Sequence, residues 1–395
     1  EPVPASALIN GRGWRDCGDP SLSGRECRNQ GLNHPGLHLR AGEDHRLRII
    51  NAGAFAEFQI QLDEHDFAVT EADGTDLVPR RYHRLNILSA QRYSIVISAN
   101  QTHRDSFMLR ARMVQHCFGE ENTELASELH TYVQYTSDAP ARLIEQAPDS
   151  KDWSETIELQ CRDMNTTELV PVVPNPPPPR ADHLIYVRSN FEIGAWRLSR
   201  GFFNSSSWRA NATSPTLFRY LDGAKTGDPA FTDPFASIGG GERAKPGTEI
   251  EVPAAPVNAG VNDVAFARDR ELVYQTAGTQ VIDILISNFD DGAHPFHLHG
   301  HKFWVLAGGK GYPPEDLAPP SNLNYGLGEG FPGTGPSHPE KVPGVNLKDP
   351  LYRDTATVEA FGWALFRFAA DNPGLWAFHC HISRSRISPW YERNS

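Results

Sequence analysis

The stretch HPFHLHGHKFWVL, residues 294–306, decides how this chain is interpreted. It gathers four of the chain's 16 histidines into one short segment. Side chains two residues apart on a β-strand point to the same face, so His297 and His299 are predicted to share a face. His294 precedes a proline, and a loop-like His-Pro step can turn it away from the other two. Imidazole is a ligand that copper and zinc both accept, so this segment is a candidate metal site.

A second cluster, HCH at residues 379–381, lies near the end of the chain. The same two-residue period predicts that His379 and His381 share one face of a strand and that Cys380 points to the other. The cysteine can then bind one metal ion while its two neighbours contribute to a different metal site. Only a few covalent bonds would join the two sites, which suits electron transfer from a thiolate-bound copper to a second copper centre.

Simpler interpretations compete with a copper site. A single His-x-His pair is common on a solvated strand face, but two such pairs, one of them around a cysteine, are much rarer by chance. Zinc uses the same residue types, yet tetrahedral zinc needs only four ligands and has no use for a thiolate that faces away from its neighbours. A zinc hydrolase built on His297 and His299 would need a glutamate or aspartate base at motif spacing, and none is evident. Copper is therefore the predicted metal.

Short apolar runs separated by turn residues predict an all-β fold. The expected strands lie at residues 7–9, 47–50, 58–62, 93–97, 107–111, 184–187, 281–286, 303–306, 355–358, 364–368 and 375–378. No long amphipathic helix is expected. We predict two β-sandwich or barrel domains, at residues 1–136 and 183–395. A Pro-rich linker at 137–182, with four successive prolines from Pro176 to Pro179, would join them.

Charge and hydropathy disfavour several kinds of partner. Among the 395 residues, 49 are acidic and 37 are basic, which gives a net charge of −12. This balance argues against nucleic acid and anionic membrane surfaces as partners. No apolar run approaches the ~18 residues that a membrane-spanning helix needs, so no membrane span is expected.

Four Asn-x-Ser/Thr sequons favour a secreted protein, whose signal peptide would lie upstream of residue 1. The sequons begin at Asn100, Asn165, Asn204 and Asn211. In an oxidising compartment Cys17 and Cys27 would close a short loop as a disulfide. Cys117 and Cys161 could form a second bridge, although sequence alone does not fix the pairing. The alternative is four free, buried thiols.

The sequence resembles the multicopper oxidases, a superfamily of laccases, ascorbate oxidases and ferroxidases. The most specific matches are HPFHLHGHKFWVL (294–306), YRDTATV (352–358) and DNPGLWAFHCHI (371–382). The first part of the chain resembles the middle cupredoxin domain of that superfamily, through ALINGRG (7–13), RLRIINAG (46–53), VTEADG (69–74) and QRYSIVI (91–97). CRDMNTTELVP (161–171) and GFFNSSSW (201–208) resemble the fungal branch. The resemblance implies that both predicted domains are cupredoxin-like Greek-key β-sandwich or barrel domains.

The resemblance also implies a role for each matching residue. His294 and Cys380 would bind the type 1 copper, which takes electrons from a small-molecule donor. His297 would bind the type 2 copper. The type 3 copper pair would be bound by His299, His379 and His381. The type 2 and type 3 coppers would together reduce dioxygen to water, and the catalytic residues linking the centres would be Cys380, His379 and His381. His301 is expected to lie beside the site or to be structural.

Two departures from the family pattern affect the expected activity. The family's trinuclear cluster takes four of its eight histidines from an N-terminal domain with two His-x-His motifs, and no such pair occurs before residue 294. Ser385 and Trp390 stand where the family has a further type 1 histidine and an axial methionine or leucine, and residues 383–395 resemble nothing in the family. We therefore expect a fragment that lacks an N-terminal cupredoxin domain and is inactive alone. The alternative is a non-catalytic cupredoxin-like copper-binding protein or a degenerate oxidase.

The electron donor is expected to be a phenol, an aromatic amine, ascorbate or a metal ion. Loops such as residues 308–350 are candidates for the rim of the substrate site. Glu71 and Asp73 could tune such a pocket, but acidic residues in a turn such as Ala72-Asp73-Gly74 are more often structural.

Overall fold

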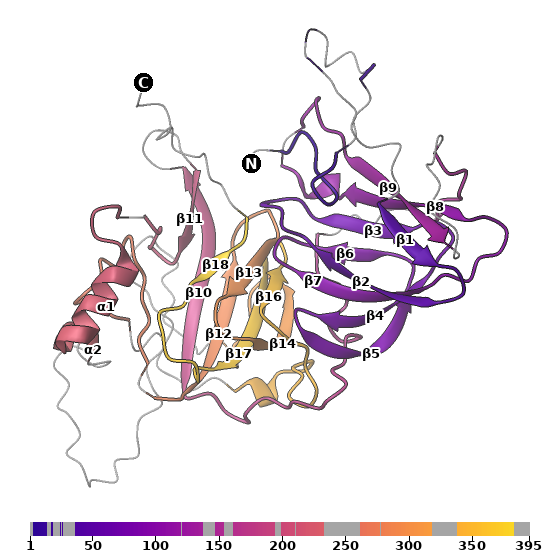
Figure 1. The fold of residues 1–395 in the computed structure, drawn as a ribbon. Helices are drawn as coiled ribbons and strands as arrows, with labels where there is room; N and C mark the ends of the chain where they lie inside the picture. The colour runs from indigo at the N-terminus through magenta and orange to yellow at the C-terminus, as the bar shows by residue number, and fades with distance from the viewer. Residues whose placement is uncertain are drawn as a thin grey trace. The chain divides into compact units, whose positions relative to one another are not determined.

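The computed structural model describes a chain built mainly from β-strands (Figure 1). The described residues are 3–13, 17, 18, 24, 26, 36–119, 121–136, 147–153, 161–193, 199–209, 211–232, 261–276, 278–317 and 338–382. The chain divides into two compact units, the first made of Glu1–Val173 with Thr355–Thr357 and Cys380–Ser395, the second of Pro174–Asp354 with Val358–His379. The predicted all-β class is confirmed. No helix in the described ranges is long and apolar enough to span a membrane.

The described strands between residues 37 and 136 form two sheets in the first unit. Their strands are β1 (Leu37–Arg40), β2 (Asp44–Ile50), β3 (Phe58–Leu62), β4 (Phe67–Ala72), β5 (Thr75–Tyr82), β6 (Leu85–Ile87), β7 (Arg92–Ser98), β8 (Ser106–Met113) and β9 (Glu128–Thr136). One sheet has the order β1-β9-β8-β3-β6 and the other the order β2-β7-β4-β5. Alternate side chains such as Phe67 and Val69 on β4 are completely buried. The core is therefore built from one face of each strand, as in a β-sandwich.

A tight turn at Asp73 and Gly74 joins β4 to β5, and both residues have positive φ, 45° and 76°. The buried Asp73 carboxylate accepts a hydrogen bond of 2.8 Å from the backbone N–H of Arg92. Glu71 accepts a hydrogen bond of 2.5 Å from Nη2 of Arg46. These contacts support the structural interpretation of both acidic residues. Asp73 ties the β4–β5 turn to β7, and Glu71 ties β4 to β2 across the intervening β7 of the same sheet.

The later strands form a six-stranded and a three-stranded sheet. They are β10 (His183–Ile193), β11 (Ser199–Phe203), β12 (Val281–Asn288), β13 (His294–Leu298), β14 (Phe303–Lys310), β15 (Tyr352–Arg353), β16 (Thr355–Val358), β17 (Gly362–Ala369) and β18 (Phe378–Cys380). The larger sheet has the order β11-β10-β12-β17-β14-β15, and the smaller one the order β16-β13-β18. Buried Trp304, Leu306 and Leu365 belong to the core cluster of the larger sheet. Two helices, α1 (Thr216–Thr226) and α2 (Pro229–Thr232), follow β11 in sequence.

A buried ion pair crosslinks the six-stranded sheet. Asp283 on β12 and Arg367 on β17 are register partners, and they are only 1% and 0% exposed. Arg367 donates from Nε and Nη2 to the two carboxylate oxygens of Asp283, at 2.6 and 2.7 Å. Its Nη1 donates to the carbonyl oxygen of Pro178 at 2.6 Å. The guanidinium therefore has partners in three directions, which offsets the cost of burying its charge.

The Pro-rich segment predicted as a linker, residues 137–182, is attached to strands where it is described. Pro171 forms a β-bridge with Leu77 of β5. Nε1 of Trp304 on β14 donates to the carbonyl oxygen of Asn175 at 2.7 Å, and Arg367 binds Pro178 as above. The boundaries at residues 136 and 182 stay predictions.

One of the two predicted disulfides is confirmed. Cys117 and Cys161 are bonded, with an S–S distance of 2.02 Å, and they are 44 residues apart in sequence. The bridge links the short 3₁₀ helix Gln115–Cys117 to the beginning of the segment that carries the prolines. The predicted Cys17–Cys27 bridge includes Cys27, which lies outside the described residues.

Most expected strands are present, and two of them, 58–62 and 355–358, have the bounds that the sequence predicts. Two others differ. Residues 7–9 contribute only a single bridge, from Ile9 to Arg12. The strand expected at 375–378 begins only at Phe378. The 11-residue helix α1 was not expected.

Replacing Arg367 with methionine should destabilise the second unit by roughly 3–5 kcal/mol, because Asp283 would stay buried without its opposite charge. Urea unfolding followed by tryptophan fluorescence would measure the lower midpoint. The matched control is the double variant Asp283→Leu with Arg367→Met, which removes both charges and should regain most of the lost stability. A single variant as stable as the parent would show that water reaches this pair.

Candidate metal centre

The histidine-rich strand β13 is the middle strand of the three-stranded sheet. At its end, the backbone N–H of Leu298 donates to the carbonyl of Asp354 at 3.0 Å, and that of His299 donates to the carbonyl of Ala377 at 2.9 Å. These bonds fix the end of β13 against the segments that lead into β16 and β18. The histidine positions are therefore set by regular backbone pairing rather than by a free loop.

Three imidazoles meet on one face of this sheet. The ring centroids of His297 and His299 are 4.9 Å apart, and the ring of His379 lies 5.8 Å from the first and 5.1 Å from the second. The Nε2 atoms of His299 and His379 are 3.0 Å apart. Burial, together with the neighbouring His297 and His379, lowers the pKa of His299. A lower pKa favours the neutral imidazole, which is the form that binds a metal.

Asp354 determines which nitrogen of His297 can bind a metal. Nδ1 of His297 lies 3.0 Å from the carbonyl oxygen of Asp354 and 3.4 Å from its Oδ1. Both oxygens accept hydrogen bonds, so Nδ1 carries the proton and Nε2 presents the lone pair. A carbonyl or carboxylate behind the ring is the usual arrangement for a metal-binding histidine.

The opposite face of the sheet carries phenylalanines. Phe296 follows His294 by two residues on β13, and its ring centroid lies 5.9 Å from that of Phe378 on β18. The two-residue period places His294 on the Phe296 side and Cys380 on the Phe378 side. The thiol and the first histidine therefore belong to the apolar face, away from the three clustered imidazoles.

His294 is completely buried, and its ring is held in one orientation. Its Nε2 lies 2.8 Å from Oδ2 of Asp290, and its ring centroid lies 4.9 Å from that of Phe191. A carboxylate can only accept here, so the proton is on Nε2 and the lone pair is on Nδ1. The ring is thus prepared to bind a metal through Nδ1.

Cys380 is not part of a disulfide and is half-buried. Its Sγ accepts a hydrogen bond of 3.4 Å from the backbone N–H of Ile382. His381, the other expected ligand of this cluster, is half-buried beside it. Ser385 and Trp390, the positions that depart from the family pattern, lie outside the described residues.

Trp376 covers the end of the histidine strand. Gly300 has a φ of 68°, and a Cβ placed there would lie 2.6 Å from Cε2 of Trp376, so no side chain fits. The ring centroid of His301 is 6.0 Å from that of the same indole, and its Nδ1 is 3.3 Å from the carbonyl oxygen of His299. His301 is packed beside the cluster, which supports the structural role expected for it.

Another group of possible metal-binding atoms occurs in the described ranges. Donor atoms of Glu57, Cys117 and Cys161 lie within 4.8 Å of one another. The two sulfurs are bonded to each other, so they have no thiolate to offer a metal.

Sequence reasoning missed the two aspartates that orient imidazoles, Asp290 and Asp354. Asp354 stands inside the YRDTATV segment, so its motif was noticed although its contact with His297 was not. Asp290 precedes a second aspartate, Asp291, in the loop before β13. Nothing in the sequence distinguishes the one that contacts His294.

The histidines and the cysteine on the two faces of this sheet agree with the likeness of the chain to known proteins. Two sequence families, both described as multicopper oxidase, match residues 1–135 and 213–393. The chain belongs to the multicopper oxidase family. The cofactor of this family is copper, and the activity of the family is of the oxidoreductase class. The predicted family and metal are confirmed.

Similar proteins include plant and fungal oxidases. The chain is 28% identical to an L-ascorbate oxidase of Cucumis sativus, over 96% of this chain and 59% of that protein. It is 29% identical to the iron multicopper oxidase fer1 of Mycosarcoma maydis, over 89% of this chain and 46% of that protein. The chain therefore spans between 46% and 59% of the length of these two relatives.

Two solved structures share the fold. One is Fet3p, a multicopper oxidase that functions in iron import, and the other is a laccase from Botrytis aclada. Both have a TM-score of 0.65 and 22% identity, and they match 90% and 95% of this chain. The matched part is 55% of each of those chains. The likeness confirms the cupredoxin-type β-sandwich architecture.

Replacing Asp290 with alanine should weaken Cu(I) binding by roughly 10–100-fold, because the carboxylate that orients His294 and holds its Nε2 proton would be lost. Competition with a chromogenic Cu(I) chelator would measure the change. The matched control is Asp291→Ala, since Asp291 is exposed and adjacent. Equal affinity of Asp290→Ala and the parent chain would contradict the assignment of Nδ1 as the metal-binding atom.

Proposed function

We propose that this chain is the middle and C-terminal part of a laccase-like copper oxidase. The complete protein would couple one-electron oxidation of a phenolic compound, an aromatic amine, ascorbate or a metal ion to four-electron reduction of dioxygen to water. The observation that carries the proposal is the sheet with two chemically different faces. Three imidazoles converge on one face, and the other bears a thiol and a buried, oriented imidazole.

The donor atoms of the thiol face fit a type 1 copper, and those of the histidine face fit the type 2 and type 3 coppers. Nδ1 of His294 and Sγ of Cys380 would hold the type 1 copper, because thiolate with imidazole is the donor set of such sites. Nε2 of His297 would hold the type 2 copper. The type 3 pair would be held by His299, His379 and His381. Copper bound in these places supplies one-electron transfer from the donor and a centre at which dioxygen is reduced.

The chain's own residues prepare the donors. Asp290 keeps a proton on Nε2 of His294, and the carbonyl of Asp354 keeps one on Nδ1 of His297, so each ring offers its other nitrogen. The rings of Phe296 and Phe378 pack on the thiol side and lower the local dielectric constant there. Cys380 is covalently continuous with the histidines on both sides of it, so a short bonded path joins the two faces.

We infer that oxygen reduction needs a further cupredoxin domain that supplies additional histidines. The family pattern takes eight histidines for its trinuclear cluster, and this chain offers four at matching positions. His299 is exposed on the histidine face, so that face is accessible to further ligands. The limited span of the chain against its relatives is consistent with this inference. The chain alone is therefore expected to be inactive as an oxidase.

The alternative is a non-catalytic cupredoxin-like copper-binding protein or a degenerate oxidase. It would use the same donors on the thiol face without a working trinuclear cluster. The number of copper ions bound per chain separates the two functions, since an oxidase fragment loads the histidine face and a simple copper-binding protein binds one ion or none.

The parent chain should bind copper on both faces, and the triple variant His297→Ala, His299→Ala, His379→Ala should lose the copper of the histidine face. Elemental analysis after copper loading and desalting measures the stoichiometry. The matched control replaces three exposed histidines of the first unit with alanine: His38, His103 and His116. It should keep the parent stoichiometry.

Two outcomes would contradict the proposal. A stoichiometry of at most one copper that the triple variant leaves unchanged would favour the non-catalytic alternative. Oxygen consumption by the copper-loaded chain alone, followed with an oxygen electrode and a phenolic donor, would contradict the need for a further domain.

We also propose that the protein is a secreted fungal glycoprotein. The Cys117–Cys161 disulfide supports an oxidising compartment. Asn100 and Asn165 are exposed, so attached glycans would project into solvent. The fungal assignment rests on the resemblance of segments 161–171 and 201–208 to that branch.

Asn204 should stay unmodified in folded protein from a glycosylating host, whereas the exposed Asn100 should carry a glycan. The amide of Asn204 is used inside the fold, because its Nδ2 donates to the carbonyl of Tyr186 at 3.2 Å and its Oδ1 accepts from the N–H of Arg188 at 3.0 Å. Mass-spectrometric peptide mapping reads out each site. A glycan found on Asn204 would show that this turn opens in the native protein.

A further inference from the structure

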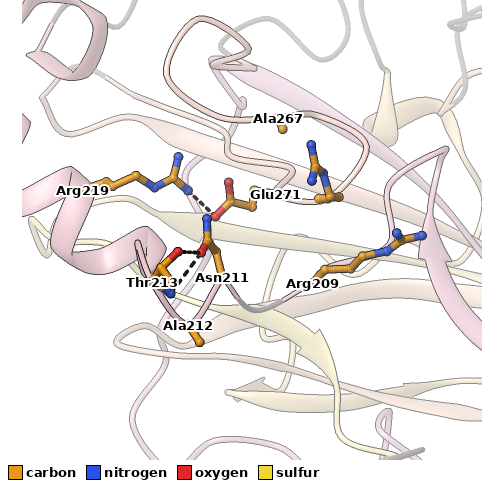
Figure 2. Close-up of a pocket in the computed structure, with 8 residues that line it drawn as sticks. Arg209, Asn211, Ala212, Thr213, Arg219, Ala267 and Glu271 are labelled. Atoms are coloured by element: carbon orange, nitrogen blue, oxygen red, sulfur yellow. Dashed lines mark hydrogen bonds and ion pairs between the residues drawn. The ribbon is translucent and has the colours of Figure 1, made fainter.

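A cavity of about 570 Å³ lies beside helix α1, apart from the residues assigned to copper. Figure 2 shows side chains that line it. Its charged and hydrogen-bonding lining consists of Arg209, Asn211, Thr213, Arg219, Arg270 and Glu271. Three guanidinium groups against one carboxylate give the lining a formal excess of two positive charges. The whole chain has a net charge of −12, so this cavity is a local exception to the protein's acidity.

One of the three arginines, Arg219, already forms hydrogen bonds with other groups of the protein. Arg219 on α1 donates from Nη2 to Oε1 of Glu271, a pair visible in Figure 2. Its Nε donates to the carbonyl of Ser214 at 3.2 Å, and its Nη1 donates to the carbonyl of Ala265 at 3.2 Å. Arg219 and Glu271 thus neutralise each other and hold three segments of the cavity wall together. This ion pair is therefore a structural part of the cavity wall.

The positive charges of the other two arginines, Arg209 and Arg270, are only weakly neutralised by neighbouring groups. Within the described ranges, the guanidinium of Arg209 makes no hydrogen bond or ion pair; its backbone N–H donates to the carbonyl of Arg270 at 3.1 Å. Nε of Arg270 lies 3.4 Å from a carboxylate oxygen of Asp269, in a pair whose side chains are 56% and 71% exposed. An ion pair that exposed is weak. The backbone hydrogen bond holds the segments that carry Arg209 and Arg270 next to each other.

Asn211 adds an oriented polar group. Its Oδ1 accepts from the N–H of Thr213 at 3.1 Å and from the hydroxyl of Thr213 at 2.9 Å (Figure 2). It also accepts from the N–H of Ser214 at 3.1 Å. With the oxygen saturated, the side chain is locked, and only its amide N–H groups remain for a ligand. The cavity thus offers two guanidinium groups and one amide donor, and its lining has few acceptors.

We propose that this cavity binds a small organic anion that carries hydroxyl groups, of the sugar-acid or sugar-phosphate class. Guanidinium groups recognise the planar carboxylate and the phosphate group, because two parallel N–H donors match two oxygens. The volume lies in the range of ligand sites, roughly 300–1,000 Å³, and is much larger than an inorganic anion needs. The hydroxyl-bearing body of the ligand would meet Asn211 and Thr213.

Isothermal titration calorimetry at low ionic strength tests the proposal with gluconate, glucose 6-phosphate, inorganic phosphate and neutral glucose. The chain is prepared without copper in a host that adds no N-glycans, so that the Asn211 amide is unmodified. At least one organic anion should bind saturably, and glucose should not bind. The variant Arg209→Gln with Arg270→Gln should weaken that binding by at least about tenfold, since it removes both charge-assisted contacts.

The matched control is Arg40→Gln with Arg48→Gln, which removes two exposed arginines from the first unit and should bind as the parent does. Equal thermal midpoints would show that both variants are folded. The proposal is overturned if neither organic anion binds, if the cavity variant binds like the parent, or if inorganic phosphate binds as tightly as glucose 6-phosphate. The experiment needs neither copper nor oxidase activity, so its failure leaves the proposed function unaffected.

Discussion

The two-residue period of a β-strand is the constraint on which the metal centre depends. On β13 it sends His294 and Phe296 to one side and His297 to the other, and on β18 it separates Cys380 from His379. No additional loop or domain movement is needed to create two different environments. A single short sheet provides an apolar face for a thiolate and a polar face for imidazoles. Only the backbone of one sheet then separates the thiolate side from the imidazole side.

The carbonyl of Asp354 couples the position of the strand to the position of a ring. It accepts the ladder bond from the N–H of Leu298 and also the hydrogen bond from Nδ1 of His297. If β13 slipped relative to this segment, the same carbonyl would lose both partners. The tautomer of His297 is therefore a property of the sheet register, whereas that of His294 depends on the side chain of Asp290. The two faces are controlled by different kinds of contact.

Local pattern explains which parts of the fold the sequence could predict. Strands such as β3 and β16 were predicted with their bounds because their apolar residues alternate and turns flank them. The segment before β18 is not the strand that its apolar residues predict, and there Nε1 of Trp376 donates to the carbonyl of Asn372 at 2.9 Å, a contact that no local pattern specifies. Helix α1 carries exposed Leu217 and Phe218 and has no side-chain N-cap, so its start and its apolar face are hard to recognise in the sequence, although Gly227 marks its end with a φ of 70°.

For the site, the ligand-type residues were readable because histidine and cysteine are rare and their spacing is periodic. Their supporting residues were not, because a contact such as that of Asp290 with His294 depends on the path of a loop. The same limit applies to the cavity beside α1. Arg209 and Arg270 are ordinary surface arginines in the sequence, and only the backbone bond between their segments makes them neighbours. The pairing of Asp283 with Arg367 is likewise set by strand order, which no local pattern specifies.

The contact between Gly300 and Trp376 limits the order in which this end of the site can change during evolution. Trp376 can be replaced by a smaller residue while Gly300 stays, since nothing then collides. The reverse order is blocked, because any Cβ at position 300 meets the indole. Even with a smaller residue at position 376, the positive φ at position 300 would favour asparagine or aspartate over other replacements for the glycine. Beside the copper ligands, Gly300 must therefore be retained as long as Trp376 is present, whereas Trp376 can be replaced first.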